Sequence, residues 1–204
     1  MLIGGTFLAQ LIPILLQPIL RRMFTPEEFG IMAVYFSIVS IVCVFVNLNY
    51  QAAVVLPEDE KDSMALVLGS LVISSVISLF FGLILVLFSD LFLAFFKFPS
   101  GLKPWLILLP ISIFLNSAHL IFSGWLTRKK AFRAFALNKV SRRMAEGVGQ
   151  LSLGVKWHSA GLIVGTFIGD LVNGITYWVQ YIKTGGTFSK EIRQRIKGNL
   201  KRYK

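Results

Sequence analysis

LIPILLQPILRRMFTPEEFG, residues 11–30, decides the fold, because in this stretch a long apolar run changes abruptly into a charged corner. Upstream, residues 3–20 contain no charged side chain, which fits a helix crossing a hydrocarbon core that needs about 20 apolar residues. Thr25 then has the position of an N-cap, with Pro26 at the first helical position and Glu28 completing a capping box. A second apolar run follows at once, so the stretch predicts a membrane hairpin.

The composition is that of an integral membrane protein. Of the 204 residues, 55% are hydrophobic and 15% charged, and the mean hydropathy is +0.70. A soluble domain cannot hide so large an apolar share in its core. The single cysteine, Cys43, excludes an intramolecular disulfide and argues against a thiolate metal site. The net charge of +11 fits cytoplasmic loops and anionic headgroups, and we expect no nucleic-acid partner.

The apolar runs predict an all-α integral membrane fold, a six-transmembrane-helix bundle in residues 1–183. The spans are expected at residues 2–23, 26–56, 63–88, 104–127, 140–155 and 161–181, followed by a basic cytoplasmic tail or linker at 184–204. The fifth span rests on parity, because the basic stretch 128–143 and the basic tail should share the cytoplasmic side. With both ends of the chain cytoplasmic, most of the 21 lysines and arginines lie inside.

Small residues predict close helix packing in two spans. Ser70, Ser74, Ser78 and Gly82 recur every fourth residue of the third span, and the sixth has three glycines within residues 161–169. No strand precedes these glycines to make a phosphate-binding turn. Both patterns are therefore interpreted as structural.

Polar side chains line one face of four spans, since successive helix residues are about 100° apart. The faces comprise Thr6, Gln10, Gln17 and Arg21; Ser37, Ser40, Asn47 and Gln51; Ser112, Asn116, His119, Ser123 and Thr127; and Thr166, Asp170, Asn173 and Tyr177. Polar groups at membrane depth turn toward a bundle interior or a water-filled cavity, so we expect a hydrated central cavity. Pro13 and Pro18 make the first face deformable, a candidate mobile wall. The alternative, that such faces only join helices by hydrogen bonds, stays open.

Charged residues within the spans each allow two interpretations. Asp170 is expected to pair across the bundle with Arg142 or Arg143. Arg142 and Glu146, four residues apart, can instead pair with each other. The two arginines that end the first span are either cavity ligands or headgroup anchors.

The sequence has no catalytic motif. It contains no paired His/Cys metal spacing, no GxSxG and no P-loop. We therefore expect no enzymatic activity, no catalytic or metal-binding residues and no cofactor.

Four segments carry a family resemblance. They are PILRRMFTPEEFGIMAVYFSIVSI (18–41), NLNYQAAVVLPEDE (47–60), WLTRKKAFRAFALNKVSRR (125–143) and GLIVGTFIGDLVNGITY (161–177). With them the chain resembles the N-terminal half of the polysaccharide biosynthesis proteins, the Wzx-type O-antigen flippases of the multidrug/oligosaccharidyl-lipid/polysaccharide exporter superfamily.

The resemblance implies one lobe of a two-lobe flippase fold with a cytoplasmic N-terminus. Such proteins pass undecaprenyl-diphosphate-linked oligosaccharides across the bacterial plasma (inner) membrane by alternating access, with proton or sodium coupling. The length is that of one lobe, so we expect a partial chain whose partners are a second six-helix half or further copies of itself, besides membrane lipids. Its role would be in lipopolysaccharide or other surface polysaccharide biosynthesis.

Such a substrate needs cationic groups at its phosphates and a hydrogen-bonding lumen at its sugars. The polar faces, rather than the family, supply the candidates. The candidates for the phosphates are Arg21, Arg22 and Arg142. The candidates for the sugars are Gln10, Gln17, Asn47, Gln51, Asn116 and Asn173. Two further cavity candidates are His119 and Asp170.

Three other functions stay open. A drug or small-cation exporter of the same superfamily would use Asp170 as its cation partner, but arginines outnumber acidic residues in the spans. A membrane subunit or scaffold that transports nothing fits the half length. An integral glycan-modifying enzyme is disfavoured by the lack of catalytic carboxylates.

Overall fold

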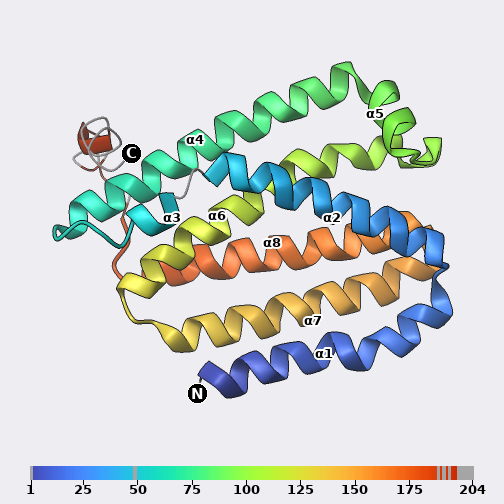
Figure 1. Ribbon diagram of the computed structural model, residues 1–204. Coiled ribbons are helices and arrows are strands. Elements are labelled where there is room, and N and C mark those ends of the chain that lie inside the picture. Colours follow the sequence, from blue (N-terminus) through green and yellow to red (C-terminus); the bar gives the residue numbers. More distant parts are fainter. Residues whose placement is uncertain (1, 48–49, 188, 190–191, 193, 197–204) are drawn as a thin grey trace.

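The computed structural model describes residues 2–47, 50–187, 189, 192 and 194–196, and over them the chain is all-helical, which confirms the all-α part of the predicted fold. Six long helices in this part of the chain run along one common direction (Figure 1): α1 (Leu2–Met23), α2 (Pro26–Asn47), α4 (Glu60–Leu87), α6 (Leu108–Arg128), α7 (Phe132–Trp157) and α8 (Ser159–Lys183). The shorter elements are α3 (Tyr50–Ala53), α5 (Ser89–Phe96) and a 3-10 helix, η1 (Ser100–Ile107).

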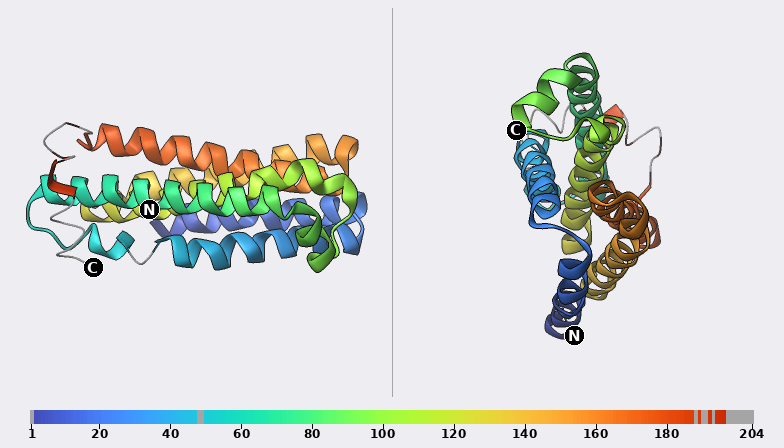
Figure 2. Two further views of the ribbon diagram at one scale, coloured as in Figure 1. Left: turned by 90° about the horizontal axis from the view of Figure 1, so that it is seen from above. Right: turned by 90° about the vertical axis from the view of Figure 1, so that its right-hand side faces the viewer.

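The long helices form an elongated slab. In the end-on view of Figure 2, α4 and α5 lie at one edge and α1 at the other, with α6, α8 and α7 between them. The most extensive helix pair is α7 with α8, and α1 packs mainly against α7. Leu16 and Phe24 lie against Gly147 and Gly154 of α7, so α1 and α7 run in the same direction.

Four helices among the described residues are long and apolar enough to cross a membrane. They are Pro26–Val46 of α2, Glu60–Leu87 (α4), Ser100–Arg128 (η1 with α6) and Ser159–Lys183 (α8). Their outer surface is apolar: Val44, Phe80 and Leu83, for example, are each more than half exposed. Such a surface fits contact with lipid rather than with water.

The corner after α1 contains the predicted capping box. The backbone N–H of Thr25 donates to Oε2 of Glu28 at 2.8 Å, and the N–H of Glu28 donates to Oγ1 of Thr25 at 3.3 Å. Two donors at the start of α2 are thereby satisfied reciprocally. The sequence-based prediction for this corner is confirmed.

The second span differs from the prediction. A single helix was expected over residues 26–56, but α2 ends at Asn47 and α3 is a separate element. Arg128, at the end of α6, donates from its guanidinium to the carbonyls of Val55, Pro57 and Glu58. These carbonyls are held by a side chain from another helix, so the chain after α3 turns at the end of α6 instead of extending the span.

The helices that contain the third and fifth predicted spans begin before those spans. α4 starts at Glu60, because the carboxylate of Asp59 accepts from the N–H of Lys61 at 2.9 Å and caps the helix. The hydrogen bond from this N–H is the largest cause that holds the pKa of Asp59 below its usual range, and the guanidinium of Arg195 lowers this pKa further. α7 starts at Phe132, so most of the stretch 128–143, expected at the membrane surface, is helical.

Small residues make close helix contacts, as their spacing predicted. The hydroxyl oxygens of Ser74 on α4 and Ser117 on α6 are 2.7 Å apart. A Cβ added at Gly149 of α7 would lie only 2.9 Å from Cα of Gly165 on α8. Any side chain at these two positions would therefore force the backbones of α7 and α8 apart.

Replacing Gly165 with Ala is expected to destabilise the chain by about 1–3 kcal/mol, the usual cost of overpacking, because the new methyl group would collide with the backbone of Gln150. The matched control is Gly30→Ala, since a Cβ there meets nothing within 4 Å. The control should be neutral or slightly stabilising because alanine favours helix. Thermal unfolding of the purified chain in detergent measures both variants, and equal melting temperatures would contradict the packing role.

Candidate functional site

A row of polar side chains follows the contact between α7 and α8, and we call it the polar seam. It comprises Asn138, Arg142, Glu146 and Gln150 of α7 and Thr166, Asp170, Asn173 and Tyr177 of α8. The α7 members recur every fourth residue and so share one helix face. All members except Arg142 are buried. The seam is therefore an interior feature between helices whose outer surface is largely apolar.

The centre of the polar seam is an ion pair. Nη2 of Arg142 donates to Oδ1 of Asp170 at 2.6 Å, and Nδ2 of Asn116 on α6 donates to Oδ2 of Asp170 at 2.9 Å. Both carboxylate oxygens thus have a donor. The side chain of Asp170 is 3% exposed and that of Arg142 is 23% exposed, so each charge depends on the other. The prediction that Asp170 pairs with an arginine of the preceding helix is confirmed for Arg142.

Asn116 connects the polar seam to two further helices. Its Nδ2 also donates to the carbonyl of Ser112 at 3.0 Å, and the hydroxyls of Ser112 and Tyr35 lie 2.9 Å apart. His119 lies one turn from Asn116, and its ring meets that of Tyr177 edge-on with centroids 5.2 Å apart. Hydrogen bonds and ring contacts therefore join α2, α6, α7 and α8 around one polar centre.

Two more interactions extend the seam along α7. Arg143 donates from Nη1 to Oε2 of Glu146 at 2.9 Å, so the alternative pairing of Arg142 with Glu146 is wrong. Gln150 donates from Nε2 to Oγ1 of Thr166 at 3.1 Å. Two arginines thus balance two carboxylates. Within the described residues no group of three or more His, Cys, Asp or Glu side chains can hold a metal ion.

In the described part of the chain Nε of Arg142 has no hydrogen-bond partner, and Nδ2 of Asn138 has none of good geometry, although its side chain lies beside the hydroxyl of Tyr177. Both atoms are covered, and they lie one helical turn apart on α7. A buried N–H without an acceptor costs about 1–3 kcal/mol. An oxygen acceptor placed at these donors would therefore be bound favourably.

The candidates on α1 do not reach the polar seam. Gln10, Gln17, Arg21 and Arg22 are all exposed. They belong to the helix at the edge of the slab (Figure 2). Arg21 donates from Nε to Oε1 of Gln17 at 3.2 Å, so these two share a face, as their spacing predicted. The side chains of Asn47 and Gln51 lie outside the described residues.

The candidates thus fall into two groups. Asn116, His119, Arg142, Asp170 and Asn173 gather at or beside the polar seam. The exposed polar face of α1 is separate from them. The two groups lie on different helices, the first on α6, α7 and α8 and the second on α1.

Asn138, Glu146 and Gln150 were not among the predicted site residues. Asn138 lies in the basic stretch that was expected at the membrane surface. It was therefore not predicted to share a helix face with Arg142. The signal was the four-residue period on α7, visible once the helix starts at Phe132.

The opposite face of α7 is apolar and exposed. Leu137, Met144, Val148 and Val155 are each more than half exposed, and their spacing of seven, four and seven residues puts them on one side. α7 therefore turns its polar residues toward α8 and its apolar residues outward. Because its polar face is covered by α8, α7 can lie in lipid as part of the α7–α8 hairpin, although its composition alone does not predict a membrane span.

The apolar helices and the enclosed polar seam define an all-helical, multi-pass membrane protein. A model of the family described as polysaccharide biosynthesis protein matches residues 19–196. The chain therefore belongs to the polysaccharide biosynthesis protein family, which confirms the resemblance seen in its sequence and points to a bacterial membrane. No curated protein and no solved structure matches the chain. The matched range includes the whole polar seam together with Arg21 and Arg22.

Removing one partner of the central ion pair is expected to be costly. Asp170→Ala or Arg142→Ala should each destabilise the chain by about 2–4 kcal/mol, because the remaining charge is left without its counterion. The double variant should cost little more than either single change, since no unpaired charge remains. The free energies of unfolding of the two single variants and the double variant, measured in detergent, test this prediction.

The matched control is the exposed pair of Lys103 and Asp90, which has the same 2.6 Å separation. Its coupling free energy should stay below about 1 kcal/mol. If the effects of Asp170→Ala and Arg142→Ala are simply additive, the pair does not hold α7 to α8.

Proposed function

We propose that this protein is a flippase, which moves undecaprenyl-diphosphate-linked oligosaccharides across the bacterial inner membrane for O-antigen or another surface polysaccharide. The polar seam carries this proposal, because charged and amide side chains are kept inside a protein whose outer surface is apolar. Membership of the polysaccharide biosynthesis protein family supports the class of cargo. The proposed activity is translocation, without enzymatic chemistry and without a cofactor.

The depth of the polar seam supports a path for polar cargo. Asp170 lies near the middle of α8 (Ser159–Lys183), a helix of 25 residues. At a rise of about 1.5 Å per residue this helix is longer than a hydrocarbon core of about 30 Å, so its middle lies near the centre of the bilayer. Ionisable groups at that depth are costly and commonly mark a substrate or ion pathway.

Arg142 is suited to a phosphate. Its guanidinium already holds Asp170 through Nη2, while its Nε lacks an acceptor and its side chain is 23% exposed. Guanidinium and amide donors match phosphate and sugar oxygens, and Asn138 adds a buried amide donor one turn away. A phosphate at Arg142 would compete with Asp170, and this competition can couple substrate binding to the movement of α7 against α8.

The exposed face of α1 supports a cavity completed by further helices. Gln17 and Arg21 are exposed on a helix of the slab edge, where contact with lipid would be unfavourable. Pro13 and Pro18 inside α1 remove two backbone donors and ease its bending. We propose that this face lines the cavity opposite a second six-helix half or a second copy, with six crossings and a cytoplasmic N-terminus.

Deleting the gene in its host tests the proposed activity. Surface polysaccharide should be lost and the lipid-linked oligosaccharide should accumulate in the inner leaflet, and expression of the chain should reverse both effects. The host supplies any second half that the cavity needs. Normal synthesis of the lipid-linked oligosaccharide and normal export after deletion would exclude the flippase role, whereas loss of its synthesis would indicate an enzyme or a scaffold for one.

Arg21→Gln is expected to lower export about tenfold, which corresponds to the loss of one charge-assisted contact with a substrate phosphate. The amount of protein in the membrane should not change, because Arg21 is exposed. The matched control is Arg133→Gln, another exposed arginine, which lies at the start of α7 and belongs to none of the polar faces. The amount of surface glycan relative to immunodetected protein measures the effect. Full export by the Arg21→Gln variant would exclude a role for Arg21 in the cavity.

A further inference from the structure

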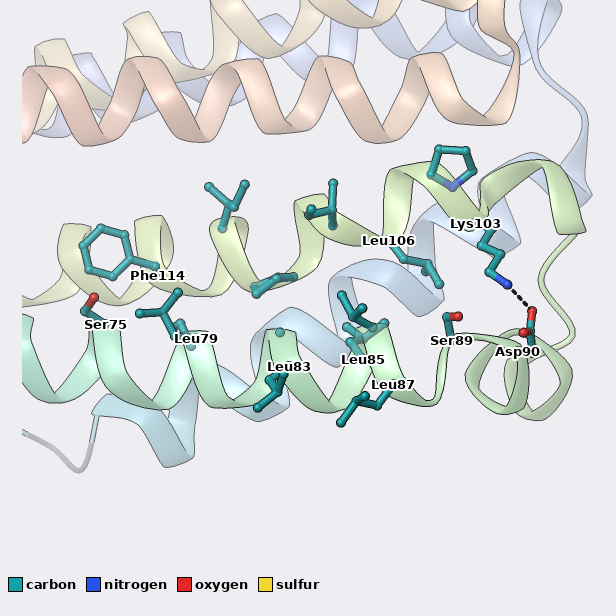
Figure 3. A pocket seen from close by; sticks show the side chains of 17 residues that line it. Ser75, Leu79, Leu83, Leu85, Leu87, Ser89, Asp90, Lys103, Leu106 and Phe114 are labelled. Atoms are coloured by element: carbon teal, nitrogen blue, oxygen red, sulfur yellow. Dashed lines mark hydrogen bonds and ion pairs between the residues drawn. The ribbon is translucent and has the colours of Figure 1, made fainter.

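An open groove lies between α4 and α6, and α5 and η1 close it at one end (Figure 3). Its volume of about 1040 Å³ is at the upper end of the range for small-molecule sites. Its walls are mainly apolar and include Leu79, Leu83, Leu87, Ile107, Ile111 and Phe114. Neither the polar seam nor the polar face of α1 contributes a residue to it.

One end of the groove carries a positive and a negative charge side by side. Nζ of Lys103 lies 2.6 Å from Oδ1 of Asp90, and the two side chains are 48% and 82% exposed (Figure 3). An exposed pair of this kind contributes little to stability. Both groups are therefore available to a ligand that brings a negative and a positive charge of its own.

The length of the groove matches one leaflet of a bilayer. It extends along α4 from Ser75, near the middle of the helix, to Ser89 just beyond its end. At about 1.5 Å per residue this is about 21 Å, compared with about 15 Å for half of the hydrocarbon core. The ion pair thus lies at the level of the headgroups, and the apolar walls follow the path of one hydrocarbon chain.

We propose that this groove binds phosphatidylethanolamine. The primary ammonium group donates to the carboxylate of Asp90, the phosphate accepts from Lys103, and one acyl chain lies along α4 and α6. Charge complementarity selects this lipid: phosphatidylglycerol has no cation for Asp90, and the quaternary ammonium of phosphatidylcholine has no hydrogen to donate. The proposal does not depend on glycan translocation, because α4 and α5, which line the groove, lie at the edge of the slab opposite α1 (Figure 2).

Native mass spectrometry of the delipidated full chain, titrated separately with these three lipids, tests the proposal. Phosphatidylethanolamine should bind about three- to tenfold more tightly than either of the others, as expected for one additional charge-assisted contact. The double variant Asp90→Asn, Lys103→Gln should lose this preference. The matched control is Glu60→Gln, Lys129→Gln, which neutralises a pair of the same 2.6 Å separation at the other end of α4 and should keep it.

A second pair of variants tests the apolar walls. Leu83 and Phe80 both lie on α4 and are both more than half exposed, but only Leu83 lines the groove. Leu83→Trp should fill the groove and weaken phosphatidylethanolamine binding at least fivefold, and Phe80→Trp should leave binding unchanged.

Four results would overturn the proposal. These are equal binding of the three lipids, a preference that survives in the Asp90→Asn, Lys103→Gln variant, displacement of phosphatidylethanolamine by undecaprenyl phosphate, and a dimer that Leu83→Trp abolishes. The last two would assign the groove to an isoprenoid chain or to a second copy of the protein.

Discussion

The ion pair between Arg142 and Asp170 is the contact on which the α7–α8 hairpin and its surroundings depend. Small residues beside it let the two backbones approach closely, and a Cβ added at Gly169 would lie only 3.2 Å from the carbonyl oxygen of Arg142. Once enclosed, neither charge is stable without the other, and Asn116 occupies the second carboxylate oxygen from α6. Close packing and charge pairing therefore stabilise each other, and a substitution that weakens one also weakens the other.

Features that depend on local spacing could be predicted from the sequence. The capping box of Thr25 and Glu28 is such a feature, because its partners are three residues apart. The pairing of Asp170 was predictable for another reason: few basic residues lie at the same depth in a neighbouring helix. The start of α7 was not, since a run of basic residues looks like a membrane surface whether or not it is helical.

Which helix faces contact one another could not be predicted from the sequence. Periodicity shows that Gln17 and Arg21 share a face, but not which helix, lipid or partner that face meets. In the slab α1 packs Leu16 against α7, and its polar face is exposed. The groove beside α4 was equally hidden, because Asp90 and Lys103 meet only when α5 and η1 fold back over the helix ends. Such sites depend on tertiary contacts between distant parts of the chain.

The polar row of α7 also constrains how the protein is made. On scales derived from translocon insertion, an arginine or lysine at the centre of a helix costs about 2.5–3.5 kcal/mol, and α7 contains Lys139, Arg142 and Arg143 besides Glu146. α8 follows after the single residue His158 and supplies the compensating Asp170. We expect the two helices to leave the translocation channel together as a hairpin, so that α7 waits there until the ribosome has synthesised α8.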